Sequence, residues 1–377
     1  MNLKIASKNI ESLVFTYKRI KKKLRILYAI LFCIFFTLFV IKFFSKKGEI
    51  IDMKVLDYIN REVDRCLTYK TKEQQNEEFK KLKSKFPIEP IRISATTAVF
   101  KHTSSTQSVI LKRVIHSPSN NLNEDCMSLS LQSPYICKTL KAFRTNRILP
   151  DGTTQVLIWI ISEFLDVKIS QRAVAGNENK IRAIIHDALL GLKYLHSQNV
   201  AHLDLKIANI MGKTTPAGVI YKLIDFGYSQ KMPDSGFLII EKKNYGTYPY
   251  KPAEVVFKNE HGLKSDIWSL GAICWFLSLQ YTPFYFDSYE KDIASYRKFL
   301  KPKTDSLKDL KNHRFIFNEN TSIALKHFIK LTMQIEPKKR PTAVELLKHP
   351  FISGEDLDLS YDSGDDIIEE DSGYGSS

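Results

Sequence analysis

Cysteine is sparse in this chain of 377 residues. The five cysteines are scattered and form no CxxC pair, so the sequence indicates neither a zinc site nor a disulfide framework. We interpret them as reduced structural thiols. No internal repeat of solenoid length is present. Lysine and arginine are absent from residues 354–377, which are acidic and rich in glycine and serine; this composition predicts a disordered acidic tail.

The chain has enough apolar residues for a folded core. With 44% apolar and 26% charged residues, it is not expected to be disordered throughout, and its length allows several domains or one large enzyme with tails. The net charge of +15 has its densest cluster at residues 18–25, directly before an apolar run. A basic balance fits nucleic acid or an anionic membrane. This placement favours the membrane, and we expect no nucleic-acid partner.

The apolar run predicts one membrane-spanning helix. Residues 26–41 carry no charge, and the run extends to Phe44 because the Lys42 ammonium can reach the interface. We therefore predict a basic N-terminal segment over 1–25 and a transmembrane helix over 26–44. A signal peptide is the alternative, but the run is longer than a usual signal core and no small-residue cleavage site follows it.

The rest of the chain changes from strand-like to helix-like patterns. Residues 45–86 are highly charged with patches of helical spacing, which fits a partly helical stalk or a plain solvated spacer. β-Branched runs over 88–115 predict antiparallel strands. Apolar residues recur with helical period over 177–197 and predict an amphipathic helix. Strands first and helices later indicate an α+β fold.

The strongest chemical signal lies between residues 202 and 227. Residues 202–209 read HLDLKIAN, and Asp225-Phe226-Gly227 follows. Phosphoryl transfer needs a carboxylate to orient the acceptor, a cation for the transferred phosphate and oxygen ligands for magnesium, and this stretch contains all of them. It resembles the catalytic loop and metal-binding turn of protein kinases. A surface loop can match one motif by chance, but further motifs follow in kinase order.

The resemblance covers residues 87–353 and implies a bilobal protein kinase fold, with a small β-rich N-lobe that contains helix C and a larger helical C-lobe. It implies ATP and Mg²⁺ as cofactors. In this reading Asp204 accepts or orients the proton of the substrate hydroxyl, and Lys206 stabilises charge on the transferred phosphoryl group. Asn209 and Asp225 hold magnesium.

Two residues of the N-lobe resemble the kinase pair that positions ATP. Lys112, in VILK, is similar to the strand lysine that contacts the α and β phosphates, and Glu124 is similar to the helix C glutamate. We predict an ion pair between them, although a strand lysine can also be a plain solvated charge. Ser128 departs from the family, because kinases bury an apolar residue at that position.

The glycine-rich loop of kinases has no counterpart here. Its glycine positions fall on Arg92, Ser94 and Thr97, before Val99, and the segment contains no glycine. We expect a stiffer lid over ATP, with weak nucleotide affinity or slow turnover. Hydroxyls such as that of Ser94 partly replace the lost amide contacts in this hypothesis.

Residues 158–165 resemble the strand and hinge that bind adenine. Glu163 to Leu165 are predicted to offer backbone hydrogen bonds to the base, and the small Ser162 side chain is expected to leave the back pocket open. A buried core strand is an equally compatible interpretation of the same run.

The end of the activation segment is similar to GTxxYxAPE, with Pro and Ala transposed in GTYPYKPAE at residues 246–254. The resemblance implies that Thr247 bonds both Asp204 and Lys206, which favours serine or threonine over tyrosine as acceptor.

Three further positions carry structural or regulatory predictions. Asp266, in DIWSLG, is expected to cap the catalytic-loop backbone, and Glu254 is expected to pair with Arg340. Leu203 stands where many kinases use arginine to grip a phosphorylated activation loop, so we predict basal activity without that phosphorylation.

The tail motif DSGYGS resembles a degron that a ubiquitin ligase reads once Ser372 and Ser376 are phosphorylated. An inert acidic tail is the alternative.

The sequence thus predicts a membrane-anchored serine/threonine kinase acting on protein substrates, with a membrane-tethered pseudokinase scaffold as the alternative. The two indicators of orientation conflict. Lysine and arginine are more numerous before the apolar run, which would put the kinase domain in a lumen. Reduced thiols and a degron make sense only in the cytosol, and we expect the kinase domain there.

Overall fold

The computed structural model describes residues 88–355, except 95, 106, 117–123, 150, 242–244, 280–293, 298–299, 301–314 and 316. The predicted basic segment, transmembrane helix, stalk and most of the acidic tail lie outside these residues. Among the residues described, no helix combines the length and apolarity needed to cross a bilayer.

The first part of the described chain is a five-stranded sheet with the order β1-β2-β3-β5-β4. Its strands are β1 (Ile88–Ile93), β2 (Thr97–Thr103), β3 (Ser108–Ile115), β4 (Thr139–Ile148) and β5 (Thr154–Glu163). Strand β5 pairs antiparallel with both β3 and β4. Strands are therefore present over residues 88–115, as the sequence predicts.

The packing divides the described chain into two units. Residues 88–98 and 102–107 belong to the first, and residues 99–101 and 108–355 belong to the second. Apart from Ser94, every predicted site residue lies in the second unit.

Alternation of apolar and polar residues explains the central strands. In β3, Val109, Leu111 and Arg113 are buried, and Lys112, which lies between Leu111 and Arg113, is half-buried. The β5 side chains from Leu157 to Ile161 are all buried. Helix α4 (Glu124–Ser130) packs against β4. The fold places Lys112 on the central sheet, facing the helix that begins at Glu124.

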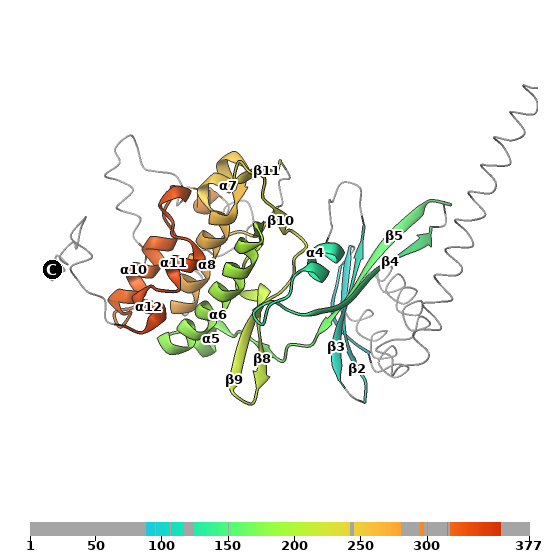
Figure 1. Cartoon of the computed structure of the whole chain (residues 1–377), viewed down its shortest axis with the longest axis horizontal. Coiled ribbons are helices and arrows are strands. Elements are labelled where there is room, and N and C mark those ends of the chain that lie inside the picture. The colour runs from blue at the N-terminus through green and yellow to red at the C-terminus, as the bar shows by residue number, and fades with distance from the viewer. Residues whose placement is uncertain are drawn as a thin grey trace, which may run out of the picture. The chain divides into compact units, whose positions relative to one another are not determined.

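Helices make up much of the rest of the second unit (Figure 1). They are α5 (Gln171–Val174), α6 (Glu178–Ser197), α7 (Ala253–Lys258), α8 (Leu263–Ser278), α10 (Ile323–Thr332), α11 (Ala343–Leu346) and α12 (Pro350–Ser353). The Asn177 side chain caps α6 by accepting a hydrogen bond from the Lys180 N–H at 3.0 Å.

The apolar stripe predicted over residues 177–197 is the buried face of α6. All seven of its members are buried: Ile181, Ile184, Ile185, Ala188, Leu189, Leu192 and Leu195. This face packs against α8, whose residues from Ser265 to Ser278 are buried on all sides. A helix that is buried on all sides forms the centre of a core, so α8 supports the segments that pack against it.

Short strands and turns complete the second unit. They are β6 (Val167–Lys168), β7 (Val200–Ala201), β8 (Ile210–Thr215), β9 (Gly218–Leu223), β10 (Gln230–Lys231), β11 (Phe237–Ile239), β12 (Glu260–Gly262) and the 3-10 turns Ile207–Asn209 and Pro337–Lys339. Strand β7 pairs with β10, β11 with β12, and β8 lies between β6 and β9. Residues 202–209 therefore form a connection held at one end by β7 and at the other by β8.

Candidate active site

Helix α8 fixes the loop at residues 202–209 through Asp266. This fully buried carboxylate accepts hydrogen bonds from the backbone N–H of His202 at 2.8 Å and of Leu203 at 2.9 Å. His196 lies 3.0 Å from the same carboxylate. The two main-chain bonds hold Leu203 at a φ of 62°, a left-handed conformation that a leucine adopts rarely. The predicted cap of the catalytic-loop backbone is therefore confirmed.

His202 is held as firmly as the backbone around it. Its Nε2 lies 3.0 Å from the carbonyl oxygen of Ile224 and therefore donates to it, which leaves Nδ1 to accept from the Asp204 N–H at 3.3 Å. The imidazole thus connects the loop to the residue before Asp225.

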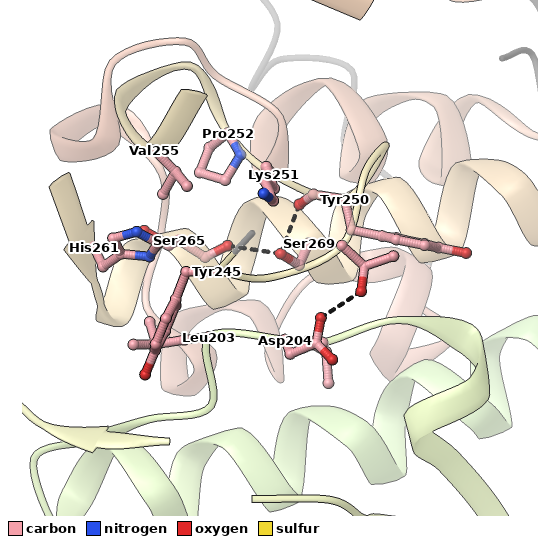
Figure 2. A pocket seen from close by; sticks show the side chains of 12 residues that line it. Leu203, Asp204, Tyr245, Tyr250, Lys251, Pro252, Val255, His261, Ser265 and Ser269 are labelled. Carbon is pink, nitrogen blue, oxygen red and sulfur yellow. Dashed lines mark hydrogen bonds between the residues drawn. The ribbon is translucent and has the colours of Figure 1, made fainter. Parts of the chain in front are cut away.

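Asp204, Lys206 and Thr247 form a closed triangle of hydrogen bonds. The Thr247 hydroxyl donates to Asp204 Oδ1 at 2.6 Å, and the Lys206 ammonium donates to Asp204 Oδ2 at 2.7 Å and to Thr247 Oγ1 at 2.9 Å. Figure 2 shows the bond between Asp204 and the threonine hydroxyl. The predicted contacts of Thr247 are confirmed, and they fix the direction in which the Asp204 carboxylate points.

Gly246 allows the activation segment to approach the catalytic loop. Its φ is +79°, and a Cβ at this position would lie 3.0 Å from the carbonyl oxygen of Leu203. Glycine meets both requirements, because it adopts positive φ without strain and has no side chain. Thr247 therefore reaches Asp204 because the residue before it is glycine.

Lys112 joins the sheet to the other half of the site. Its ammonium lies 2.5 Å from Glu124 Oε1 and 2.6 Å from Asp225 Oδ1. Burial would lower the pKa of Lys112, but the two carboxylates outweigh it and hold the pKa above its ordinary value. Burial would likewise raise the pKa of Asp225, but Lys112 lowers it to about 2. Both groups are charged at neutral pH, and the predicted Lys112–Glu124 ion pair is confirmed.

The two predicted magnesium ligands suit a hard cation. The Asn209 amide nitrogen donates to the Asp204 carbonyl oxygen at 2.8 Å and to Asp204 Oδ2 at 3.3 Å, so the Asn209 amide oxygen is free to act as a ligand. Asp225 offers its second carboxylate oxygen, since Oδ1 faces Lys112. Magnesium prefers oxygen ligands and usually takes only one or two of them from protein when phosphates supply the others. The donor set therefore fits.

The predicted adenine-binding hinge is firmly held. The Glu163 N–H donates to the Lys138 carbonyl oxygen at 3.0 Å, and its carboxylate pairs with Lys222 at 2.6 Å and Lys213 at 3.1 Å. Opposing effects act on its pKa: burial raises it, but the lysines and the Lys138 N–H lower it below the ordinary value. Leu165 is buried. The part of this hinge in adenine binding stays a prediction.

In the segment without glycine, Ser94 and Thr97 hydrogen-bond to each other across a turn. The Ser94 hydroxyl donates to the Thr97 carbonyl oxygen at 3.1 Å and accepts from the Thr97 N–H at 3.1 Å. Val99 follows, half-buried in β2. The Ser94 hydroxyl and the Thr97 amide are thus engaged within the turn, and their contact with phosphates stays a prediction.

An apolar cluster holds the start of the activation segment against the catalytic loop. Leu203 packs there with Ala201, Met232 and Tyr245. The Tyr245 hydroxyl also donates to the carbonyl oxygen of Tyr228. Leu203, at the sequence position where the family resemblance implies an arginine, therefore makes apolar contacts.

The end of the activation segment is tied to the helical lobe. Arg340 donates to the Glu254 carboxylate with two nitrogens, at 2.6 and 2.8 Å, and also to the carbonyl oxygens of Gln334, Lys264 and Ile335. This bidentate pair was predicted from the sequence and is confirmed.

Sequence reasoning missed several polar residues near the site. It did not single out Lys251, which lines a pocket beside Asp204, or Arg144, which donates to both carboxylate oxygens of Asp125 and so fixes α4 on β4. The one signal in the sequence for Lys251 was its charge next to Tyr250, a residue that packs on α8.

Comparison with known proteins agrees with this geometry. The family model described as a protein kinase domain matches residues 94–352. The chain therefore belongs to the protein kinase domain family, and its β-sheet N-lobe and helical C-lobe form the protein kinase fold.

Individual relatives are similar over parts of their length. The chain is 31% identical over 175 residues to the calcium/calmodulin-dependent protein kinase cmkA of Emericella nidulans, covering 45% of this chain and 38% of that protein. It is 32% identical over 201 residues to the serine/threonine-protein kinase pakA of Talaromyces marneffei, covering 52% and 28%. It is 30% identical over 263 residues to the probable serine/threonine-protein kinase mkcE of Dictyostelium discoideum, covering 67% and 34%. The chain spans between 28% and 38% of the length of these relatives.

Proposed function

We propose that this protein is a serine/threonine kinase that transfers the γ-phosphate of ATP to proteins. The observation that carries the proposal is the triangle formed by Asp204, Lys206 and Thr247. It directs a carboxylate and a cation toward one point, as transfer to a hydroxyl requires. Relatives whose names describe serine/threonine kinases support the same choice of acceptor.

Each side chain has a defined part in this proposal. Asp204 orients the acceptor hydroxyl and takes its proton, and Lys206 neutralises charge on the phosphoryl group as it moves. Lys112 contacts the α and β phosphates from the sheet. Asn209 and Asp225 would hold Mg²⁺, which, when bound with ATP, neutralises the phosphate oxygens.

The pseudokinase scaffold is the weaker alternative. Its support is the missing glycines in the turn around Ser94. A scaffold would have no need of Lys112 paired with Glu124 and Asp225 at 2.5 and 2.6 Å. We expect slow turnover in place of inactivity, because the segment around Ser94 has no glycine and its Thr97 amide is already bonded within the turn.

Transfer of radiolabelled phosphate from ATP by the full chain tests the proposal. Asp204→Asn should lower the rate by about 10²–10⁴-fold, the range that general-base catalysis contributes. Asp234→Asn, at an exposed position in the same part of the chain, should leave it unchanged. Equal labelling by the unmodified protein and Asp204→Asn would remove the enzymatic function and leave the scaffold.

We also propose that residues 26–44 anchor the protein in a membrane with the kinase domain in the cytosol. The support is the uncharged run beside the basic cluster at residues 18–25. Deleting residues 26–44 should release the protein from a carbonate-washed membrane fraction. Asn320-Thr321-Ser322 is a glycosylation sequon, and it reports orientation because Asn320 is exposed. A glycosidase-sensitive shift that Asn320→Gln abolishes would place the domain in a lumen.

The ubiquitin-ligase partner is a proposal from the tail sequence alone. Phosphorylation of Ser372 and Ser376 would supply the two charges that such a ligase reads. Replacing both serines with alanine should lengthen the cellular half-life of the protein, and an unchanged half-life would leave the tail inert.

A further inference from the structure

A pocket lies beside Asp204, on the face of the catalytic loop that meets the activation segment (Figure 2). Leu203 and Asp204 line it from the loop, Tyr245 and Lys251 from the activation segment, and Ser265 from α8. Asp266 on α8 accepts two backbone N–H groups of the loop, and Thr247 of the activation segment donates to Asp204. The pocket therefore lies beside the carboxylate at which the substrate hydroxyl would be placed.

Lys251 brings a cation into this pocket without a counterion. The side chain is 6% exposed, and its ammonium lies 4.3 Å from the centroid of the Tyr248 ring. Within the described residues, no carboxylate pairs with it and its ammonium donates no hydrogen bond. Burial lowers the pKa of Lys251 to about 8, partly offset by Asp204, so it is charged at neutral pH. Burial and Lys251 together lower the pKa of the neighbouring His261 to about 4.

The acidic groups near Lys251 are already engaged elsewhere. Asp204 shares its charge with Lys206 at 2.7 Å, and Glu254 shares its charge with Arg340 at 2.6 Å. Each pair is close to neutral, so Lys251 has no carboxylate partner of its own among the described residues of the pocket. A buried charge is unfavourable unless a partner of opposite sign accompanies it.

We infer that this pocket binds an anionic side chain of the protein substrate, adjacent to the acceptor residue, with Lys251 as the residue that selects it. The inference rests on the proposed kinase function, since Asp204 in the pocket wall places the acceptor. The carboxylate of aspartate or glutamate and the phosphate of a phosphoserine share the required chemistry. Both would supply the charged hydrogen-bond acceptor that the Lys251 ammonium lacks.

Peptides that differ by one side chain test this inference on the full chain. Each carries an acceptor serine among alanines, with aspartate, phosphoserine, alanine or lysine at one flanking position in turn. Binding is measured by fluorescence anisotropy and transfer by radiolabelled ATP. The variants are Lys251→Met, Lys251→Arg and, as a matched control on the exposed end of α7, Lys258→Met.

At one flanking position, aspartate or phosphoserine should tighten binding at least about tenfold over alanine, as expected of a buried charged pair. Lysine there should weaken it. Lys251→Met should abolish the difference, Lys251→Arg should keep most of it, and Lys258→Met should change nothing. The stronger of the two anionic peptides identifies the natural ligand as carboxylate or phosphate.

Absence of an anionic preference in the unmodified protein would overturn the inference, as would a preference that survives in Lys251→Met. Binding with the expected preference but without transfer to any peptide would instead overturn the kinase proposal and leave the pocket assignment standing. The two failures are therefore distinguishable.

Discussion

The Lys251 ammonium is charged although it is buried, and this burial should lower the free energy of unfolding of the protein. Replacing it with methionine, which is similar in length, should stabilise the folded protein by about 1–3 kcal/mol at pH 7, because an unpaired buried charge is removed. The folded pKa of about 8 lies below the ordinary 10.5. The unfolded chain therefore binds more protons between these values, and the stability of the unmodified protein rises with pH across that window.

Urea unfolding at pH 7 and pH 10 checks this prediction. The advantage of Lys251→Met should shrink at the higher pH, where the folded lysine has lost its proton. Asp204 and His261 face Lys251, and the lowered pKa of His261, about 4, keeps that imidazole neutral throughout this window. Destabilisation by the substitution at both pH values would contradict the prediction, and Lys258→Met should leave stability within error.

Thr247 acts on the reaction through Asp204 and Lys206. Thr247→Ala removes a hydrogen bond to a charged carboxylate, so kcat should fall about 10–10²-fold, which matches the strength of such a bond. Thr247→Ser keeps the hydroxyl and should recover most of the rate. Steady-state kinetics with one peptide substrate tests this role. An unaltered kcat in Thr247→Ala would mean that Asp204 is oriented without the Thr247 hydroxyl.

The residues of this triangle could be predicted, whereas Lys251 could not. Asp204, Lys206 and Thr247 belong to short motifs whose spacing carries their chemistry. Lys251 gains its importance from burial against Tyr248 and from nearby acids, Asp204 and Glu254, that are already paired with other cations. Those are properties of segments that meet only in the folded protein.

At the scale of elements, α8 positions the catalytic loop through one carboxylate. Asp266→Asn would set an amide NH₂ against one of the two backbone N–H groups that the carboxylate now accepts. We expect the unfolding free energy to fall by about 2–4 kcal/mol, since a buried donor loses its acceptor. The rate of transfer should drop with little change in the KM for ATP, because the loop carries Asp204.

Melting curves and a kcat-to-KM comparison test this role. Asp187→Asn is the matched control, because Asp187 also accepts a backbone N–H, from Tyr221 at 2.9 Å, but that residue lies in β9 and not in the catalytic loop. If both variants lost stability yet kept kcat, Asp266 would be a structural residue alone.

Long elements were easier to predict than short ones. The stripe of α6 repeats over about four turns, from Ile181 to Leu195, and can be read from the sequence, as can the β-branched run of β3. The pairing of β11 with β12 joins three-residue segments that have no period of their own. Such strands form because the loops around them are held in place by α7 and α8.

For the whole molecule, the Glu254–Arg340 pair connects the activation segment with the end of the helical lobe. Arg340 is 1% exposed, so Arg340→Met should destabilise the protein by about 3–5 kcal/mol by leaving a buried carboxylate unpaired. Arg340→Lys should recover only part of this, because an ammonium cannot bind both carboxylate oxygens in parallel.

Chemical unfolding of the single variants and of Glu254→Gln/Arg340→Met measures this coupling. The double variant should lose less unfolding free energy than the two single variants lose together, because it leaves no buried charge without a partner. Strict additivity would show that the two residues act independently.

The fold class as a whole followed from the sequence, because strand and helix patterns occupy separate halves of the domain and motifs mark their junctions. The polar contacts that link distant elements did not. Arg144 meets Asp125, and Lys222 meets Glu163, only because β4, β5 and β9 take particular registers.

The apolar cluster around Leu203 bears on how a cell could control this protein. Its contacts with Met232 and Tyr245 are made by apolar and aromatic side chains and involve no charged group. If basal activity needs no phosphate in the activation segment, as Leu203 predicts, a phosphatase would have nothing to reverse at that position. We expect output to be set instead by how much of the protein is synthesised, where it resides and how fast it is destroyed.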